Sequence, residues 1–219
     1  MAHKHVVVIF PHPDDEAFGA AGTIARFRAQ GVPVTYLCGT LGEMGRNMGN
    51  PTFANRETLP QIRQEELVKA CQVLDINLEQ LGYRDKTLEF EPKRDVAKHL
   101  YSFLEKIKPT LVISYYPGYA VHPDHDAFGA AAIAAVELIE PSQRPEVWAL
   151  AIKKDKEKDL GEPQIYYKIT DTFEKKYQAI VAHKSQAAGI LGGINQGPDQ
   201  LDAIVKNKLS TETFYRWEF

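Results

Sequence analysis

The sequence predicts one α/β domain, built on a mostly parallel sheet with helices packed against it. Strand-like and helix-like segments alternate along the 219 residues, as they do in α/β sandwiches. The first segment, Val6–Phe10, is uniformly apolar and rich in β-branched residues, which is typical of a parallel strand buried on both faces. The length suits a single domain over residues 1–219 with a sizeable core.

The remaining elements follow in order. A helix over 17–30 is rich in small residues and ends at Gly31, a typical C-cap. The loop over 40–56 is long for a compact domain and is interpreted as a substrate loop. Further strands are predicted at 34–39, 78–83, 111–115, 146–152 and 165–169, and further helices at 57–74, 94–106, 127–139 and about 172–183.

Composition excludes some classes of protein. The net charge of -3 argues against a nucleic-acid partner. No apolar run approaches the roughly 20 residues that span a bilayer, and no signal-peptide core precedes the first strand. Cys38 and Cys71 are predicted to be reduced, buried thiols rather than a disulfide. These features predict a cytoplasmic protein.

Two polar turns follow predicted strands. The hexapeptide PHPDDE (11–16) comes directly after the first strand, and HPDHD (122–126) follows the strand at 111–115. Open α/β sheets place their sites at such carboxyl ends. Residues 12–25 and 122–135 share nine of fourteen identical positions. Either a duplicated element or local convergence explains this similarity.

The spacing within each turn predicts a metal site. Residues three apart at a helix start lie on one side, which pairs His12 with Asp15 and His122 with His125. One imidazole and one carboxylate from the first turn, with one imidazole from the second, form a His₂Asp set with an open fourth position, typical of catalytic zinc. Ferrous iron also fits this set. Spacing alone leaves open whether Asp14 or Asp15, and whether His122 or His125, is the ligand.

The aspartate and the histidine of these two turns that do not bind the metal suit proton transfer. A carboxylate beside the metal can act as general base, and the second histidine can stabilise an oxyanion and donate a proton. The alternative is a set of turn caps and surface ion pairs. That alternative explains poorly why histidines and carboxylates crowd these two turns.

Residues outside the two turns allow more than one interpretation. Arg46, in the loop, is one of several cations that suit an anionic substrate; the others are Arg56, Arg63 and Lys86. Arg63 equally suits a helix-surface ion pair. Asp85 suits either sugar hydroxyls or a turn pairing with Arg84. His183 is predicted to be packed in the interior rather than at the rim of the site.

These motifs together resemble the LmbE/PIG-L family of zinc-dependent N-deacetylases. The resemblance rests on PHPDDE (11–16), RQEE (63–66), GYRD (82–85) and HPDH (122–125), and it extends to HKSQ (183–186). It implies a Rossmann-like three-layer sandwich. No Gly-x-Gly-x-x-Gly turn follows the first strand, so no dinucleotide is expected.

The resemblance also implies roles for individual residues. It implies that the zinc ligands are His12, Asp15 and His125, and that the general base is Asp14. It implies that His122, oriented by Asp124, acts as the acid and stabilises the oxyanion. It also implies that Arg63 and Asp85 bind the substrate. Some members carry a mobile tyrosine shortly before the second motif, and Tyr119 lies near that place.

Three segments, 40–51, 82–91 and 115–126, are most similar to the second type of bacillithiol biosynthesis deacetylase. This similarity implies removal of acetyl from N-acetylglucosaminyl malate, a small-molecule amino sugar. The resemblance also implies a homo-oligomer. The alternatives are a deacetylase or amidase for another N-acetylglucosamine compound or a bacillithiol conjugate, and a metal- or sugar-binding protein without turnover.

Overall fold

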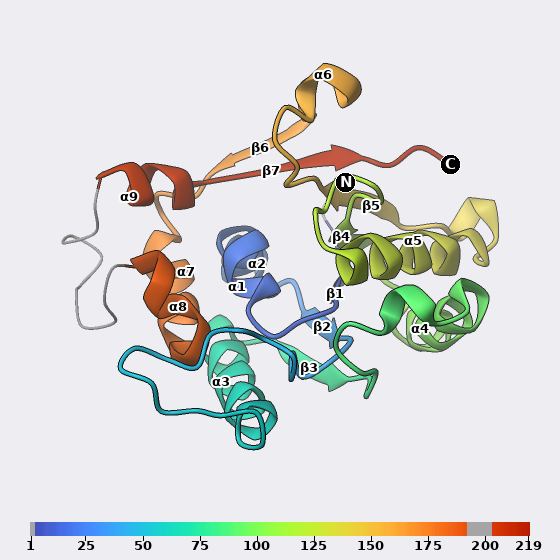
Figure 1. The fold of residues 1–219 in the computed structure, drawn as a ribbon. Helices are drawn as coiled ribbons and strands as arrows, with labels where there is room; N and C mark the ends of the chain where they lie inside the picture. Colours follow the sequence, from blue (N-terminus) through green and yellow to red (C-terminus); the bar gives the residue numbers. More distant parts are fainter. Residues whose placement is uncertain (1–2, 192–202) are drawn as a thin grey trace.

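A seven-stranded sheet forms the centre of the molecule. The computed structural model describes residues 3–191 and 203–219 (Figure 1). The strand order is β3-β2-β1-β4-β5-β7-β6. The strands are β1 (Val6–Phe10), β2 (Val34–Cys38), β3 (Asn77–Gln80), β4 (Leu111–Tyr115), β5 (Glu146–Leu150), β6 (Ile165–Lys168) and β7 (Thr211–Arg216).

The sheet is mostly parallel, as predicted. Strand β1 pairs in parallel with β2 and β4, and the parallel arrangement continues to β3 on one side and β5 on the other. Only β7 is antiparallel to its neighbours β5 and β6 among the described residues. The C-terminal strand β7 was not predicted from the sequence.

Helices cover both faces of the sheet, which confirms the three-layer architecture. Alternate residues of β1 belong to two separate cores, with Val6, Val8 and Phe10 in one and Val7 and Ile9 in the other. The helices are α1 (Asp15–Gly19), α2 (Ala21–Ala29), α3 (Leu59–Leu74), α4 (Lys93–Ile107), α5 (Pro123–Glu137), α6 (Glu157–Leu160), α7 (Phe173–Ala182), α8 (Lys184–Leu191) and α9 (Ala203–Leu209), with 3-10 turns at Leu88–Phe90 and Pro141–Gln143.

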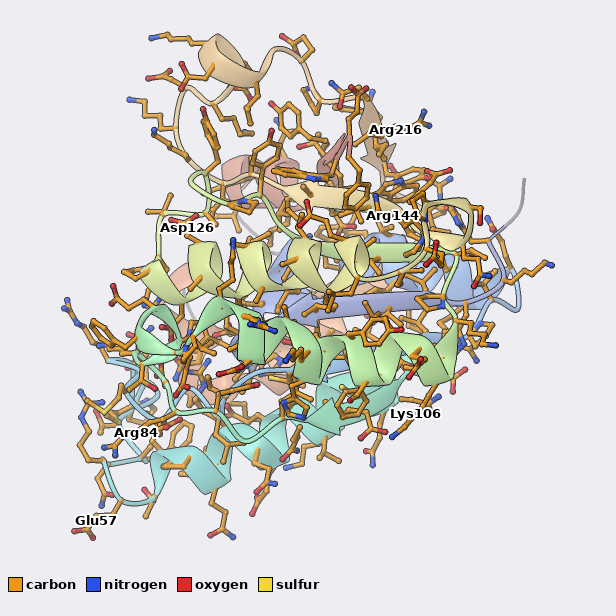
Figure 2. All side chains as sticks on the ribbon, turned by 90° about the vertical axis from the view of Figure 1, so that its right-hand side faces the viewer. Glu57, Arg84, Lys106, Asp126, Arg144 and Arg216 are labelled. Atoms are coloured by element: carbon orange, nitrogen blue, oxygen red, sulfur yellow. The ribbon has the colours of Figure 1, made fainter. Side chains whose placement is uncertain are left out.

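The two cores are covered by different helices. Helices α4 and α5 lie side by side over one face (Figure 2), and α1, α2, α3 and α7 cover the other (Figure 1). Figure 2 also shows Glu57, Arg84 and Asp126, which follow strands, at one end of the molecule. Lys106 and Arg144, which precede strands, lie at the other end.

Three predicted boundaries were wrong in ways that matter for the site. The helix predicted over 17–30 is two helices, α1 and α2, separated at Ala20. The strand predicted over 78–83 ends at Gln80. The helix predicted from residue 127 begins at Pro123, because His122 is its N-cap and its ring accepts a hydrogen bond from the Asp124 N–H. His125 therefore lies in the first turn of α5.

Both cysteines are buried free thiols, as predicted. Among the described residues, none of the helices is both long and apolar enough to cross a membrane.

A buried ion pair attaches β7 to the helices beside the first core. The Lys176 ammonium lies 2.8 Å from the Glu212 carboxylate, and both side chains are at most 2% exposed. The same carboxylate accepts hydrogen bonds from the N–H groups of Gly22 and Thr23 in α2. Each charged group of the pair has a polar partner, so the pair joins β7 to α2 and α7 at a tolerable desolvation cost. None of these hydrogen bonds involves the polar turns at 11–16 and 122–126.

Gly129 in α5 allows the helix to approach the end of β4. A Cβ atom at this position would lie 2.5 Å from the Tyr115 backbone oxygen. We expect Gly129→Ala to lower the free energy of unfolding by about 1–3 kcal/mol, measured by urea denaturation, because backbone must move to make room. Gly19→Ala is the matched control, since its Cβ would meet only the flexible end of Leu150. Equal losses in both variants would contradict this explanation.

Candidate metal and catalytic site

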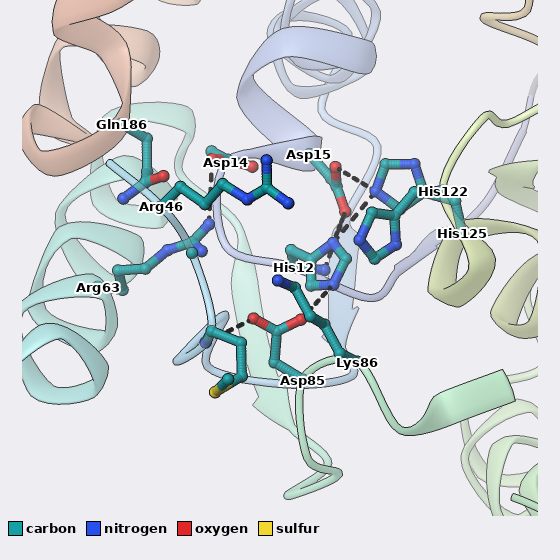
Figure 3. A pocket seen from close by; sticks show the side chains of 12 residues that line it. His12, Asp14, Asp15, Arg46, Arg63, Asp85, Lys86, His122, His125 and Gln186 are labelled. Carbon is teal, nitrogen blue, oxygen red and sulfur yellow. Dashed lines mark hydrogen bonds and ion pairs between the residues drawn. The ribbon is translucent and has the colours of Figure 1, made fainter. Parts of the chain in front are cut away.

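The two polar turns meet at the point where the chain changes direction across the sheet. From β1 the chain runs to β2 and β3 on one side, and β4 and β5 fill the other. The carboxyl ends of β1 and β4 therefore flank a crevice, which is where open α/β sheets bind ligands. A cavity of about 420 Å³ lies here, and Figure 3 shows the side chains that line it.

The hydrogen-bond partners of His12 and His125 fix which ring nitrogens carry hydrogen. His125 Nδ1 lies 3.1 Å from the Ala120 carbonyl oxygen, which can only accept, so Nε2 presents a lone pair. His12 Nε2 lies 3.1 Å from Asp85 and 3.3 Å from Asp124, so it donates to carboxylates and Nδ1 presents a lone pair. The two lone pairs face each other across 3.1 Å.

Asp15 completes a set of three acceptors. Its carboxylate oxygens lie 3.6 Å from His12 Nδ1 and 3.4 Å from His125 Nε2. Ligands of a tetrahedral zinc ion at about 2.1 Å are separated by roughly 3.4 Å, so these spacings fit a metal ion. Three acceptors facing one point repel one another unless a cation lies between them. The residues predicted as His₂Asp ligands therefore fit a metal ion (Figure 3).

The charges around the three acceptors are consistent with a cation. Burial lowers the pKa of His125, which keeps the ring neutral and able to bind a metal. Burial alone would raise the pKa of Asp15, but His125 and His12 hold it below its usual value, so the carboxylate is ionised. Burial opposes a charge on His12, yet Asp124, Asp15 and Asp85 raise its pKa well above the ordinary value, so the ring must give up its Nδ1 proton to present a lone pair to a metal ion.

Two other groupings of side chains among the described residues also bring potential ligand atoms within 4.8 Å of one another. The first is His12, His122 and His125, and the second is His12, Asp85 and Asp124. The second needs no metal, because His12 Nε2–H can donate to both carboxylates. Backbone N–H groups also hold them: Met44 donates to Asp85, and Lys86 donates to Asp124. These two carboxylates fix the orientation of the His12 ring.

His122 presents a donor rather than a lone pair. Its Nδ1 accepts the Asp124 backbone N–H at 3.2 Å, so in the neutral ring the hydrogen is on Nε2. The Asp124 carboxylate lies against His12 rather than orienting His122, which differs from the expectation from the resemblance. Asp124 contributes to the position of His122 only through its backbone N–H.

Asp14 lies beside the three acceptors in an unusual backbone conformation. Its φ of 97° is in the left-handed region that residues other than glycine rarely adopt. Its carboxylate is 3.0 Å from Arg63. Burial raises the pKa of Asp14 to about 6, although the Arg63 guanidinium opposes this rise. A carboxylate with a pKa in this range is suited to accept a proton near neutral pH.

Comparison with known proteins assigns the chain to a family. Residues 7–136 match the family described as "PIG-L: GlcNAc-PI de-N-acetylase". The chain belongs to the PIG-L family. A Bacillus cereus protein named "Probable N-acetyl-alpha-D-glucosaminyl L-malate deacetylase 2" is 47% identical, over 98% of this chain and 99% of its own length.

Two solved structures share the PIG-L fold of this chain. N,N'-diacetylchitobiose deacetylase from Pyrococcus horikoshii has a TM-score of 0.74 at 24% identity, covering 98% of this chain and 84% of its own. The 4-carboxy-2-hydroxymuconate hydratase GalB from Pseudomonas putida has a TM-score of 0.75 at 20% identity, covering 99% and 97%. At these identities the likeness concerns the fold, and two different activities are found on it.

Arg63 is buried in this PIG-L protein, not on the surface. It is 4% exposed, so a helix-surface ion pair with the glutamates that follow it is wrong. The guanidinium donates to the carbonyl oxygens of Pro13 and Gly42 as well as to Asp14. It thereby joins the first turn to the loop over 40–56 and also lines the cavity. The alternative Arg84–Asp85 pairing is not formed, since Asp85 binds His12 and Met44.

The other predicted substrate residues separate into two groups. Arg46 and Lys86 line the cavity and point into it (Figure 3). Arg56 instead donates to the Gly45 carbonyl oxygen and is not part of the lining. Tyr119 is also absent from the lining, and its ring lies 5.1 Å from the Lys153 ammonium.

Several residues of the site were missed by sequence reasoning. Tyr115 stacks on the His125 ring at 4.1 Å and donates to Asp15. Gln186 lines the cavity and donates to the Asn47 carbonyl oxygen in the loop. His183 is buried, as predicted. The HKSQ segment was the only sequence signal for Gln186, whereas the position of Tyr115 at the end of a strand could have suggested a role.

Proposed function

We propose that this PIG-L family member is a zinc-dependent hydrolase that removes the acetyl group from N-acetylglucosaminyl malate in bacillithiol biosynthesis. The observation that carries the proposal is the convergence of three acceptors from His12, Asp15 and His125 beside the partly buried Asp14 carboxylate. The name of the Bacillus cereus relative supports the substrate. The products are acetate and the free amine.

In this proposal, His12, Asp15 and His125 hold the metal. When bound, zinc acts as a Lewis acid that makes water nucleophilic near neutral pH. Ferrous iron is the alternative ion for the same ligands. Tyr115 restrains two of the three ligands, through its hydrogen bond to Asp15 and its stacking on His125.

Two side chains, Asp14 and His122, act directly on the reacting groups in the proposed reaction. Asp14 removes a proton from the water that attacks the acetyl carbonyl, and Arg63 keeps the carboxylate in place. The Nε2–H of His122 donates to the oxygen on which negative charge develops. The proton held by Asp14 then passes to the departing nitrogen as the C–N bond breaks, which restores the Asp14 carboxylate. Asp85 and Asp124 keep His12 in the required tautomer.

An acetate-release assay combined with metal analysis tests the proposal. N-acetylglucosaminyl malate, a chitooligosaccharide and an N-acetylated bacillithiol conjugate are assayed side by side with the purified, metal-loaded protein. We expect the highest kcat/KM with the malate glycoside. A higher kcat/KM with another sugar would show that the malate glycoside is not the preferred substrate. Bound metal without acetate release from any of the three compounds would indicate a binding protein rather than an enzyme.

Arg46 and Lys86 are proposed to bind the malate carboxylates. Neither side chain has an ion-pair partner among the described residues, and both line the cavity. We expect Arg46→Gln and Lys86→Gln each to raise KM for the malate glycoside about 10- to 100-fold, since hydrogen bonds to charged groups are worth about 1.5–3 kcal/mol.

Arg56→Gln is the matched control, because Arg56 is absent from the cavity lining and its guanidinium donates to the backbone oxygen of Gly45, behind that lining residue. Neutral N-acetylglucosamine serves as the second substrate, and its kinetic constants should change little in all three variants. An equal KM increase for both substrates would contradict carboxylate recognition and point to sugar binding instead.

The proposed role of Tyr119 at the substrate is tested in the same assay by Tyr119→Phe. The homo-oligomeric state and the cytoplasmic location stay predictions, which light scattering and cell fractionation would test.

A further inference from the structure

A buried histidine from the C-terminal half of the chain is linked to the proposed catalytic base. His183 follows α7, and its Nε2 lies 2.6 Å from Glu16 Oε1. Both residues are 0% exposed. The other oxygen of the same carboxylate accepts the backbone N–H of Asp14 at 3.1 Å. A continuous chain of hydrogen bonds therefore runs from α7 to the backbone of Asp14.

The backbone of Asp14 needs such support. A residue other than glycine at a φ of 97° is strained, and this strain persists only where the surroundings hold it. The carbonyl group of Asp14 is held by the N–H groups of Ala17 and Phe18 in α1. Its own N–H is held by Glu16 alone among the described residues. The peptide group before Asp14 is thus held at two points, by Glu16 at its N–H and by Arg63 at the Pro13 carbonyl oxygen.

His183 in turn fixes that carboxylate. Its Nδ1 has no hydrogen-bond partner among the described residues, so Glu16 is the polar partner of the ring. The backbone beside His183 is anchored by Ser185, whose N–H and hydroxyl both donate to Glu66 at 2.7 Å. A ring with one polar partner on an anchored backbone has little freedom to move.

We propose that His183 is a positioning residue, which holds Asp14 in its left-handed conformation through Glu16 and so aims the base at the attacking water. The inference rests on the proposed function, because it assigns Asp14 the role of base. If His183 only packed in the core, removing its Nε2–H would lower the stability of the fold alone. As a positioning residue, its loss should also alter the backbone of the turn at 12–16 and slow the chemical step.

The test compares three variants. His183→Leu removes the donor, and His183→Gln places an amide N–H where Nε2 lies. Lys176→Met removes a buried ion pair from the same helix, α7, and a hydrogen bond to the Phe18 carbonyl oxygen in α1, but no hydrogen bond to a side chain that lines the cavity. Acetate release, metal content and urea unfolding are measured for each. We expect kcat to fall about ten- to a hundredfold in His183→Leu, with KM and metal content within twofold of wild type.

The control separates positioning from stability. Lys176→Met should lose stability comparably and keep kcat within twofold, and His183→Gln should recover most of the lost kcat. A crystal structure of His183→Leu gives a readout that does not depend on activity, and we expect Asp14 to leave the left-handed region there. If His183→Leu does not fold, Glu16→Gln tests the same link. The Glu16 carboxylate accepts one hydrogen bond at each oxygen, from His183 and from the Asp14 N–H, whereas the amide of glutamine has only one acceptor oxygen.

The outcomes distinguish the two proposals. An unchanged turn in the crystal structure of the variant, or a kcat equal to that of Lys176→Met, would overturn the positioning role. A wild-type protein that releases no acetate from any N-acetyl sugar would refute the proposed function. In that case the conformation of Asp14 in the variant still decides whether His183 positions the turn.

Discussion

Replacing Asp14 by asparagine is expected to lower kcat for acetate release by roughly 10²- to 10⁴-fold while the metal stays bound. Asparagine tolerates the left-handed region, so the φ of 97° can be kept and the change is confined to the carboxylate. An amide cannot accept the proton from the attacking water. Steady-state kinetics and metal analysis on the same preparation measure both effects.

Asp75→Asn is the matched control for this substitution. Asp75 also has a left-handed backbone, with a φ of 57°, but it lies at the exposed end of α3, far from the cavity lining. We expect its kcat to stay within twofold of wild type. A kcat for Asp14→Asn within a few-fold of wild type would show that another group acts as base.

Replacing His125 by alanine is expected to weaken metal binding by more than about 100-fold and to abolish activity, because one of three converging acceptors is lost. Removing the metal from the wild-type protein with a chelator should abolish activity in the same way. Added zinc should restore activity to the chelated wild type but not to the variant at equal metal concentration.

His122→Ala is the matched comparison, because its ring lies 5.1 Å from that of His125 on the same helix start. The Nε2–H of His122 makes it a donor, so we expect this variant to keep its metal and to lose kcat by about 10²- to 10³-fold. Metal titration monitored by calorimetry measures the difference. If His122→Ala lost the metal and His125→Ala kept it, the ligand assignment would be reversed.

The two turns with similar sequences differ in their backbone. In the first, α1 begins at Asp15 after the left-handed Asp14. In the second, α5 begins at Pro123, two residues earlier in the repeated pattern. The earlier helix start carries His125 on the first turn of α5, where its Nε2 faces His12. Identical residues at matching positions therefore do not ensure the same backbone geometry. Duplication and convergence both remain explanations of the similarity between the two turns.

The sequence alone predicted the parallel strands and the two polar turns that meet at the proposed metal site. Strands buried on both faces are uniformly apolar, and ligands that directly follow such strands are carried to the same edge of the sheet by the chain itself. Spacing after β1 and β4 narrowed the candidate ligands to His12 with Asp14 or Asp15 and with His122 or His125. The choice of His12, Asp15 and His125 came from the resemblance to the PIG-L family.

Only the tertiary structure decided the partners of these residues. Asp124 turned toward His12 rather than His122, Arg63 was buried against Asp14, and His183 reached Glu16 from 167 residues away. The strand β7 and its Lys176–Glu212 pair were likewise invisible in the sequence. Spacing along a chain fixes which side chains share a turn, but contacts between distant segments depend on how the helices pack, and no local pattern encodes that packing.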